Sequence, residues 1–221
     1  MKSFGLLSVA FAAALAVACG GDGRDADVNN PANDNAAVGT AGSDTAASAN
    51  RAGSARMNSW VEDRLMGGMA EVKLGELAST KAQNAHVKAF GRTMVQDHTK
   101  AGEELKQIAS QLNIQPPVQL DDDHRDKVER LSKLQGAEFD REYINMMVDD
   151  HEKTLNALED RLEKQGDDEN PRYTPKTSDD PSESRLNRWA AQTVPTVRQH
   201  LQKARQLDEK LGRGLTNDNE R

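Results

Sequence analysis

The sequence has few of the residues that support disulfides or β-sheets. Cys19 is the only cysteine among 221 residues, which excludes a disulfide framework and a paired redox-cysteine site. Aromatic residues make up 4% of the chain, whereas Ala, Leu, Glu, Lys, Gln and Arg are abundant after residue 57, and this composition favours helices. Since no strand is expected, no phosphate-binding glycine-rich loop can follow one.

An excess of positive charge is also missing. The formal net charge is −7 at pH 7, and no basic stripe with interleaved aromatic residues occurs. A nucleic acid would be repelled by this charge, so nucleic-acid binding is not expected.

The N-terminus holds an apolar run that is too short to span a bilayer comfortably. Lys2 precedes the run LLSVAFAAALAVA, and small residues lead from it to Cys19. This pattern predicts an export signal over residues 1–18. One interpretation is an ordinary signal peptide whose cleavage region happens to contain a cysteine.

The other interpretation is a lipid anchor. The stretch AVACGG resembles the lipobox of bacterial lipoproteins, in which the cysteine is lipidated and becomes the mature N-terminus. The resemblance implies attachment to a membrane through lipid on Cys19, without a spanning helix. Gly20 stands where an Asp would retain a lipoprotein in the inner membrane, which implies an outer-membrane location facing the periplasm.

The next segment, residues 19–56, is expected to be a disordered tether behind the lipidated cysteine. Gly, Ala, Asn, Asp and Ser dominate it, so it cannot bury enough apolar surface to offset the entropy of ordering. A folded domain is predicted over residues 57–212, with an inserted polar loop at 166–185 and a flexible tail at 213–221.

Apolar residues at helical spacing predict four long helices and one short helix in this domain. The long helices are expected near 57–82, from Asn84 to the proline pair at 116–117, near 137–165 and near 184–211, with the short helix near 121–136. Asn84 is a plausible N-cap. The predicted fold class is all-α, a four-helix bundle with a short extra helix in its middle crossover.

Two stretches nearly repeat each other. MVQDHTK covers residues 94–100, MVDDHEK covers residues 147–153, and an aromatic residue stands four positions before each methionine. The two helices therefore look like equivalent parts of two duplicated helical hairpins. Such duplication is expected of ferritin-like bundles.

The repeat also contains two candidate metal ligands. His98, His151 and His200 each fall about fourteen residues into a helix, so they share a depth of roughly 21 Å along the bundle. Glu71 has a comparable depth on the first helix. All four lie on apolar faces, and together they form a candidate metal site.

Two interpretations of these residues remain open. The histidines could instead be hydrogen-bonded core residues without metal. The Glu-x-x-His signature of ferritin-type di-iron sites is absent, because Val95, Val148 and Val197 stand three positions before the histidines. If a metal binds, three imidazoles and a carboxylate suit zinc, iron or copper better than magnesium or calcium.

Neighbours of the repeated histidines are candidates for supporting roles. Met94 and Met147 lie four residues before His98 and His151, where they could be soft copper ligands or core filler. Asp97 and Asp150 could bind metal, could orient an imidazole, or could be solvated.

Several motifs resemble one bacterial family of exported proteins. These are MVQDH at 94–98, LQGAEFDREY at 134–143 and VPTVRQH at 194–200, within a resemblance that covers about residues 58–211. The family is domain of unknown function 4142, often labelled putative outer membrane protein. The resemblance implies a ferritin-like domain after a secretion signal and leaves the biochemical role open.

The sequence thus predicts an exported, lipid-anchored bundle of unestablished role, with a candidate transition-metal site at Glu71, His98, His151 and His200. The alternative is a non-catalytic structural or interaction protein of the cell envelope that binds no metal. Neither interpretation requires an enzyme.

Overall fold

The computed structural model describes residues 41–166 and 171–218. It contains five helices and one small antiparallel hairpin. The elements in chain order are α1 (Ala41–Lys81), α2 (Ala85–Gln111), α3 (Asp122–Lys133), α4 (Gly136–Glu159), β1 (Leu162–Gln165), β2 (Arg172–Pro175) and α5 (Pro181–Asp218). The predicted signal peptide, Cys19 and the first part of the predicted tether lie outside the described residues.

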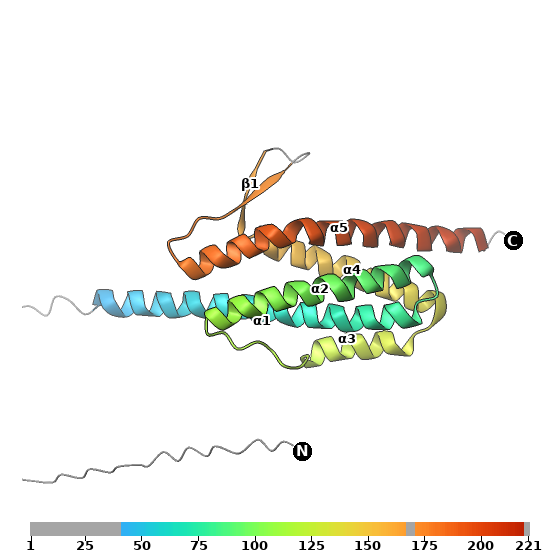
Figure 1. Cartoon of the computed structure of the whole chain (residues 1–221), viewed down its shortest axis with the longest axis horizontal. Coiled ribbons are helices and arrows are strands. Elements are labelled where there is room, and N and C mark those ends of the chain that lie inside the picture. The colour runs from blue at the N-terminus through green and yellow to red at the C-terminus, as the bar shows by residue number, and fades with distance from the viewer. Residues whose placement is uncertain (1–40, 167–170, 219–221) are drawn as a thin grey trace, which may run out of the picture. The chain divides into compact units, whose positions relative to one another are not determined.

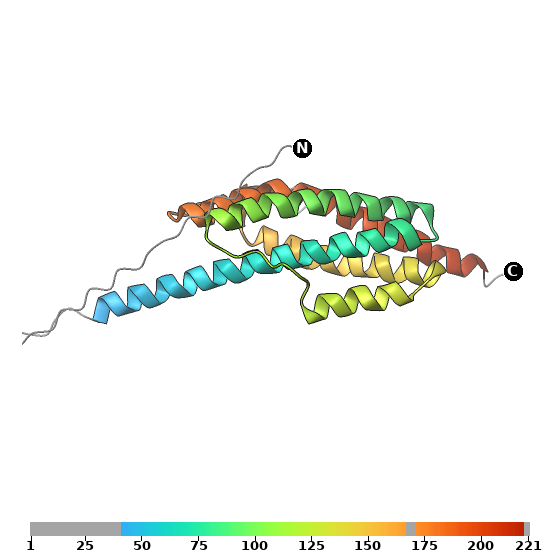
Figure 2. The same cartoon turned by 60° about the horizontal axis from the view of Figure 1, so that its bottom comes forward.

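Four long helices form a bundle of two hairpins (Figure 1). α1 packs along α2, α4 packs along α5, and further contacts join α1 to α4 and α2 to α5. α2 and α4 run in the same direction, so the chain must return along the bundle between them. An extended linker and then α3 make that return (Figure 2). The predicted four-helix bundle with a short helix in its middle crossover is confirmed.

Two glycines set how closely the first two helices approach. A Cβ added at Gly91 would lie 2.8 Å from Ala78 Cβ and 2.9 Å from Gly75 O. A Cβ added at Gly75 would likewise lie 2.8 Å from Gly91 O. Backbone therefore meets backbone at this crossing, which brings Glu71 on α1 and His98 on α2 within reach of each other.

Polar side chains define where the helices begin. The Asn84 side chain accepts a hydrogen bond from His86 N, which confirms the predicted N-cap of α2. The carboxylate of Asp140 accepts hydrogen bonds from Gln83 N at 3.0 Å and Asn84 N at 2.6 Å. Asp140 lies near the start of α4, so this buried carboxylate ties the second helical hairpin to the turn of the first.

The buried apolar residues form two clusters at different levels of the bundle. One cluster, called here the closed half, includes Leu74, Phe90, Phe139, Tyr143 and Leu207. The other, called here the open half, includes Leu65, Leu105, Leu158, Trp189 and Val197. On each of the four long helices, a candidate site residue lies in sequence between the members of the two clusters.

The structure corrects the expected start of the first helix. α1 begins at Ala41, so residues 41–56 are helical rather than part of a disordered tether. The composition of this segment indicates only how little apolar surface it can bury. A helix already stabilised inside a bundle can extend by one hydrogen bond per residue, and the alanines of this segment favour such an extension.

The structure also corrects the loop region and the C-terminal tail. α4 ends at Glu159, and residues expected in its last turn form β1, which pairs with β2 in register Leu162 to Pro175. The guanidinium of Arg161 lies 4.0 Å from the centre of the Trp60 ring, and its Nη1 donates a 2.7 Å hydrogen bond to Glu183. These contacts stabilise the turn in which the chain leaves α4 and enters β1. α5 continues to Asp218, so most of the predicted flexible tail is helical.

Within the described residues, no helix combines the length and the apolar character needed to cross a membrane.

Candidate metal centre

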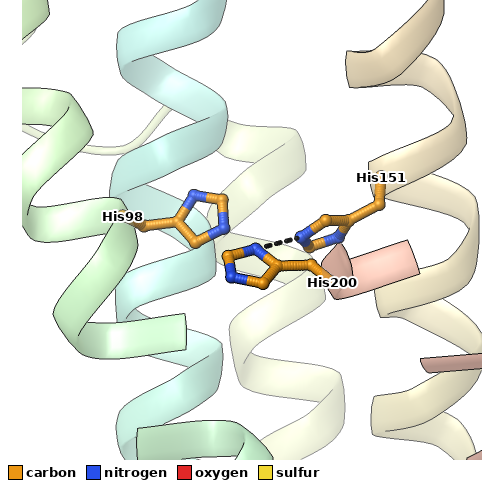
Figure 3. A group of neighbouring side chains, drawn as sticks. All are labelled: His98, His151 and His200. Carbon is orange, nitrogen blue, oxygen red and sulfur yellow. Dashed lines mark hydrogen bonds between the residues drawn. The ribbon is translucent and has the colours of Figure 1, made fainter. Parts of the chain in front are cut away.

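Three histidines from three helices meet in the interior of the bundle (Figure 3). His98 comes from α2, His151 from α4 and His200 from α5, and each pair of ring centres is 5.4 or 5.5 Å apart. His151 is fully buried and His200 is 5% exposed. The shared depth predicted from helix positions is what allows these rings to meet.

Each imidazole uses one nitrogen to donate a hydrogen bond to an oxygen. His98 Nδ1 lies 2.8 Å from Glu71 Oε2, and His200 Nε2 lies 2.9 Å from Asp97 Oδ2. His151 Nδ1 lies 2.8 Å from the carbonyl oxygen of Met147. Because carboxylates and carbonyls only accept, these partners assign one proton to each of these nitrogens.

The assignment leaves Nε2 of His151 and Nδ1 of His200 free to act as ligands. The Glu71 carboxylate favours the charged form of His98, so Nε2 of His98 becomes a ligand when this imidazole gives up its second proton. One nitrogen from each ring lies within 4.8 Å of those of the other two, and His151 Nε2 lies 3.4 Å from His200 Nδ1. His98 Nε2 is enclosed and has no hydrogen-bond partner among the described residues.

The spacing suits one small metal ion after a modest adjustment. Zinc–nitrogen bonds of 2.0–2.1 Å in tetrahedral geometry place ligand nitrogens roughly 3.3 Å apart. The His151–His200 pair already has this separation. Rotation of the His98 ring toward them would complete a three-histidine group, so the buried triad could hold a metal ion.

The carboxylate of Glu71 is ionised although it is only 4% exposed. Burial alone would raise its pKa, but electrostatic interactions with the His98 and His151 imidazoles and the hydrogen bond from His98 lower the pKa to about 2. For His98, burial opposes the charge, and the Glu71 carboxylate outweighs it and raises the pKa. In the metal-free protein, the buried charges of Glu71 and His98 therefore neutralise each other.

The other two imidazoles are neutral at pH 7. Burial lowers the pKa of His151, although Glu71 partly opposes this effect. Burial also lowers the pKa of His200 to about 4, although its hydrogen bond to Asp97 acts in the opposite direction. Neutral imidazole is the form that binds metals.

Glu71 lies on the far side of the rings from their free nitrogens. Its Oε2 contacts His98 Nδ1, and its Oε1 lies 3.4 Å from His151 Nδ1, which donates to the Met147 carbonyl instead. In this arrangement Glu71 contacts ring nitrogens that face away from the ligand group. Asp97 contacts His200 in the same way, from a different helix.

The remaining residues predicted from the repeat lie outside this ligand group. Asp150 forms a 2.8 Å ion pair with Lys127 of α3. Met94 and Met147 are fully buried in the apolar cluster of the closed half. Met147 touches the site through its backbone carbonyl only, among the contacts described.

A cavity of about 70 Å³ borders the histidines on the side of the open half. Its lining includes His98 and His200, together with Arg64 and Trp189. Neither Arg64 nor Trp189 is among the site residues that the sequence predicts. Helical spacing carried a signal for both, because Arg64 lies two turns before Glu71 and Trp189 lies three turns before His200.

The fold and the site define a helical bundle with a buried three-histidine group that could bind a metal ion. The chain belongs to the family described as domain of unknown function DUF4142, whose model matches residues 42–207. This confirms the resemblance inferred from the motifs.

Other comparisons concern the fold alone. The crystal structure of a DUF305 fragment from Deinococcus radiodurans is similar, with a TM-score of 0.51 and 16% sequence identity, over 71% of this chain and 95% of that one. No curated protein sequence matches this chain.

Proposed function

We propose that the protein binds one transition-metal ion through His98, His151 and His200. The observation that carries this proposal is the 3.4 Å contact between His151 Nε2 and His200 Nδ1. The other nitrogen of each ring donates to an oxygen, so two lone pairs face each other in a buried site. A cation between them turns this repulsion into coordination.

The surroundings supply what such an ion needs. Glu71 and Asp97 hold two of the rings from behind, and carboxylate–imidazole–metal arrangements of this kind raise ligand basicity. The negative charge of the Glu71 carboxylate would offset part of the charge of a divalent ion bound by neutral imidazoles. Zinc, iron and copper suit three nitrogen ligands, and an ion held by these three histidines would have room for a further ligand on the side of the cavity.

The test is the metal content of tag-free protein. Wild-type protein is expected to contain about one equivalent of zinc, iron or copper by elemental analysis, and the His98→Ala, His151→Ala double variant is expected to contain none. His86→Ala is the matched control, because His86 is an exposed histidine on the same helix as His98. Absence of stoichiometric metal in wild-type protein, including after incubation with each metal, would contradict the proposal.

The proposed cellular setting is the envelope. A signal peptide at residues 1–18 followed by Cys19 supports export and lipid anchoring, and Gly20 supports the outer membrane facing the periplasm. Cells fed radiolabelled palmitate are expected to label the protein, and Cys19→Ser is expected to abolish the label and release the protein from membranes. An unlabelled wild-type protein would contradict the lipid anchor.

A second candidate is a structural or interaction protein of the envelope that binds no metal. The observation that favours it is the ion pair between His98 and Glu71, which neutralises the buried charge without an ion. It predicts that the double histidine variant loses stability but that wild-type protein gains none from added metal. Thermal unfolding with and without zinc distinguishes the two candidates, because a ligand that binds only the folded state raises the midpoint.

A further inference from the structure

The cavity beside the histidines is lined by hydrogen-bond donors that have no partner. Nε and Nη1 of Arg64 are enclosed and unpaired among the described residues, and so is Nε1 of Trp189. Both side chains line the same cavity of about 70 Å³ as His98 and His200. An enclosed N–H without an acceptor costs on the order of 1–3 kcal/mol, so three of them at one cavity call for a ligand.

The missing partner must be an acceptor. Arg64 keeps its positive charge at all relevant pH values, although burial lowers its pKa. A planar guanidinium matches the two oxygens of a carboxylate or a compact oxyanion. The open position of a three-histidine metal ion would offer a second anchor to an oxygen atom of the same ligand.

We propose that this cavity binds a small oxyanion or monocarboxylate between Arg64, Trp189 and the metal ion. The anion accepts hydrogen bonds from the Arg64 and Trp189 N–H groups and places one oxygen at the open coordination position. The anion site needs the metal as its second anchor, so it rests on the proposed function. It identifies the class of ligand that the metal centre receives.

The size of the cavity limits the ligand. A volume of about 70 Å³ holds a few water molecules or a compact anion of roughly three to five non-hydrogen atoms. Formate and acetate meet this limit, whereas benzoate does not. Glycines on two helices border the cavity, and a Cβ at Gly67, Gly68 or Gly102 would meet no atom within 4 Å. These positions leave room for a small ligand to enter.

The charges predict that the anion binds only after the metal. Glu71, Asp97 and Asp63 also line the cavity, so the metal-free site carries more negative than positive groups and repels anions. A divalent ion at the histidines, together with Arg64, offsets these three carboxylates and removes the repulsion. Metal and anion should therefore bind in order.

The experiment uses full-length protein loaded with cobalt(II), whose visible spectrum reports changes in coordination. Titration with formate or acetate is expected to shift the spectrum to a saturable endpoint, and benzoate is expected to have no effect. Formate is expected to show no heat of binding to the chelator-treated protein. A cobalt-loaded protein whose spectrum is insensitive to formate, or equally sensitive to benzoate, would overturn the anion site and leave the metal site intact.

Variants distinguish the hydrogen bonds donated by Arg64 and Trp189 from the general effect of the protein's charge on formate binding. Arg64→Met is expected to raise the Kd for formate at least tenfold, Arg64→Lys is expected to lie between Arg64→Met and the wild type, and Trp189→Phe is expected to raise the Kd several-fold. Arg188→Met, which removes an exposed arginine of α5, is the control and should leave the Kd unchanged.

Cobalt binding itself tests folding and the metal site in each variant. Arg64→Met should still bind cobalt, because Arg64 is not a ligand. Equal formate affinities of Arg64→Met, Arg64→Lys and wild-type protein would overturn the role of Arg64. Failure of wild-type protein to bind cobalt would overturn the metal site, and the anion site with it.

Discussion

The two halves of the bundle differ in which buried polar atoms lack a hydrogen-bond partner. In the closed half, Phe90, Phe139 and Tyr143 pack ring against ring, and Tyr143 Oη is the enclosed side-chain atom left without a partner among the described residues. In the open half, the enclosed atoms without a partner among the described residues are nitrogens. Three belong to Arg64 and Trp189 at the cavity, and the fourth is Nε of Arg161.

This difference shows how a symmetric arrangement of helices becomes a one-sided site. The repeated motifs place His98 and His151 on equivalent helices, yet the cavity of about 70 Å³ lies on the side of the open half. The closed half supplies a rigid apolar wall behind the imidazoles, and the open half supplies donors and space in front of them. A ligand in this cavity would approach the three histidines from the side of the open half.

The largest expected effect comes from a cavity in the closed half. Phe139 is fully buried and stacks on Tyr143 with ring centres 6.3 Å apart. Phe139→Ala is expected to lower the free energy of unfolding by about 3–5 kcal/mol. Trp189→Phe in the open half removes an unpaired donor and is expected to change the free energy of unfolding by less than about 1 kcal/mol. Urea denaturation of both variants tests the comparison, and equal losses would contradict it.

A second prediction concerns the carboxylate that orients His98. Glu71→Gln keeps the shape of the side chain but removes its charge, so metal affinity is expected to fall by about 10–100-fold. Competition with a chromogenic chelator measures this change. Asp150→Asn is the control, because Asp150 pairs with Lys127 rather than with an imidazole. An unchanged affinity in Glu71→Gln would show that Glu71 does not support the ligand.

Glycine substitutions on one helical hairpin should act in opposite directions. Gly91→Ala forces a Cβ to within 2.8 Å of Ala78 and is expected to destabilise the fold by about 1–3 kcal/mol. Gly67→Ala meets no atom within 4 Å and is expected to stabilise α1 by about 0.5–1 kcal/mol. Thermal unfolding of the metal-free protein measures both, and a destabilising Gly67→Ala would contradict the open geometry at that position.

The last prediction concerns the dependence of stability on pH in metal-free protein. The pKa of His200 is about 4 in the folded state and 6.5 ordinarily, so the unfolded chain takes up this proton first. Stability contributed by neutral His200 is present above pH 6.5 and is lost as the pH falls toward 4. His98 acts in the opposite direction, because its raised pKa contributes stability at low pH that is lost as the pH rises through it.

Chelator-treated His200→Gln is therefore expected to lose less stability than wild-type protein between pH 6.5 and pH 4. Urea midpoints at several pH values measure this difference. Identical pH profiles for the two proteins would contradict the assignment of His200 as a buried neutral imidazole.

Much of the fold could be predicted because helical periodicity and helix caps are local signals. Asn84 caps α2 as expected, and the equal depth of His98, His151 and His200 brought the three rings together. Strand pairing and helix extension could not be predicted in the same way. Arg161, which directly precedes the β1–β2 hairpin, contacts the ring of Trp60 from a distant part of the chain.

The supporting partners of the histidines were predicted only in part. Sequence spacing suggested that Asp97 could orient an imidazole, but its partner is His200 on another helix, 103 residues away. Glu71 was predicted as a ligand, and the structure places it against the protonated side of His98. The depth of a residue along its helix determines which residues meet. The rotation of each helix about its axis and of each ring determines which atoms of those residues face each other.

The sequence by itself determined the helical class, the crossover bundle, the family and the level at which the three histidines lie, because all of these follow from periodicity and motif spacing. Only the tertiary structure decided which imidazole nitrogens are free, which oxygens hold the others, and that Arg64 and Trp189 share a cavity with them. Those features depend on helix rotation and on side-chain rotamers, which close packing between distant segments selects.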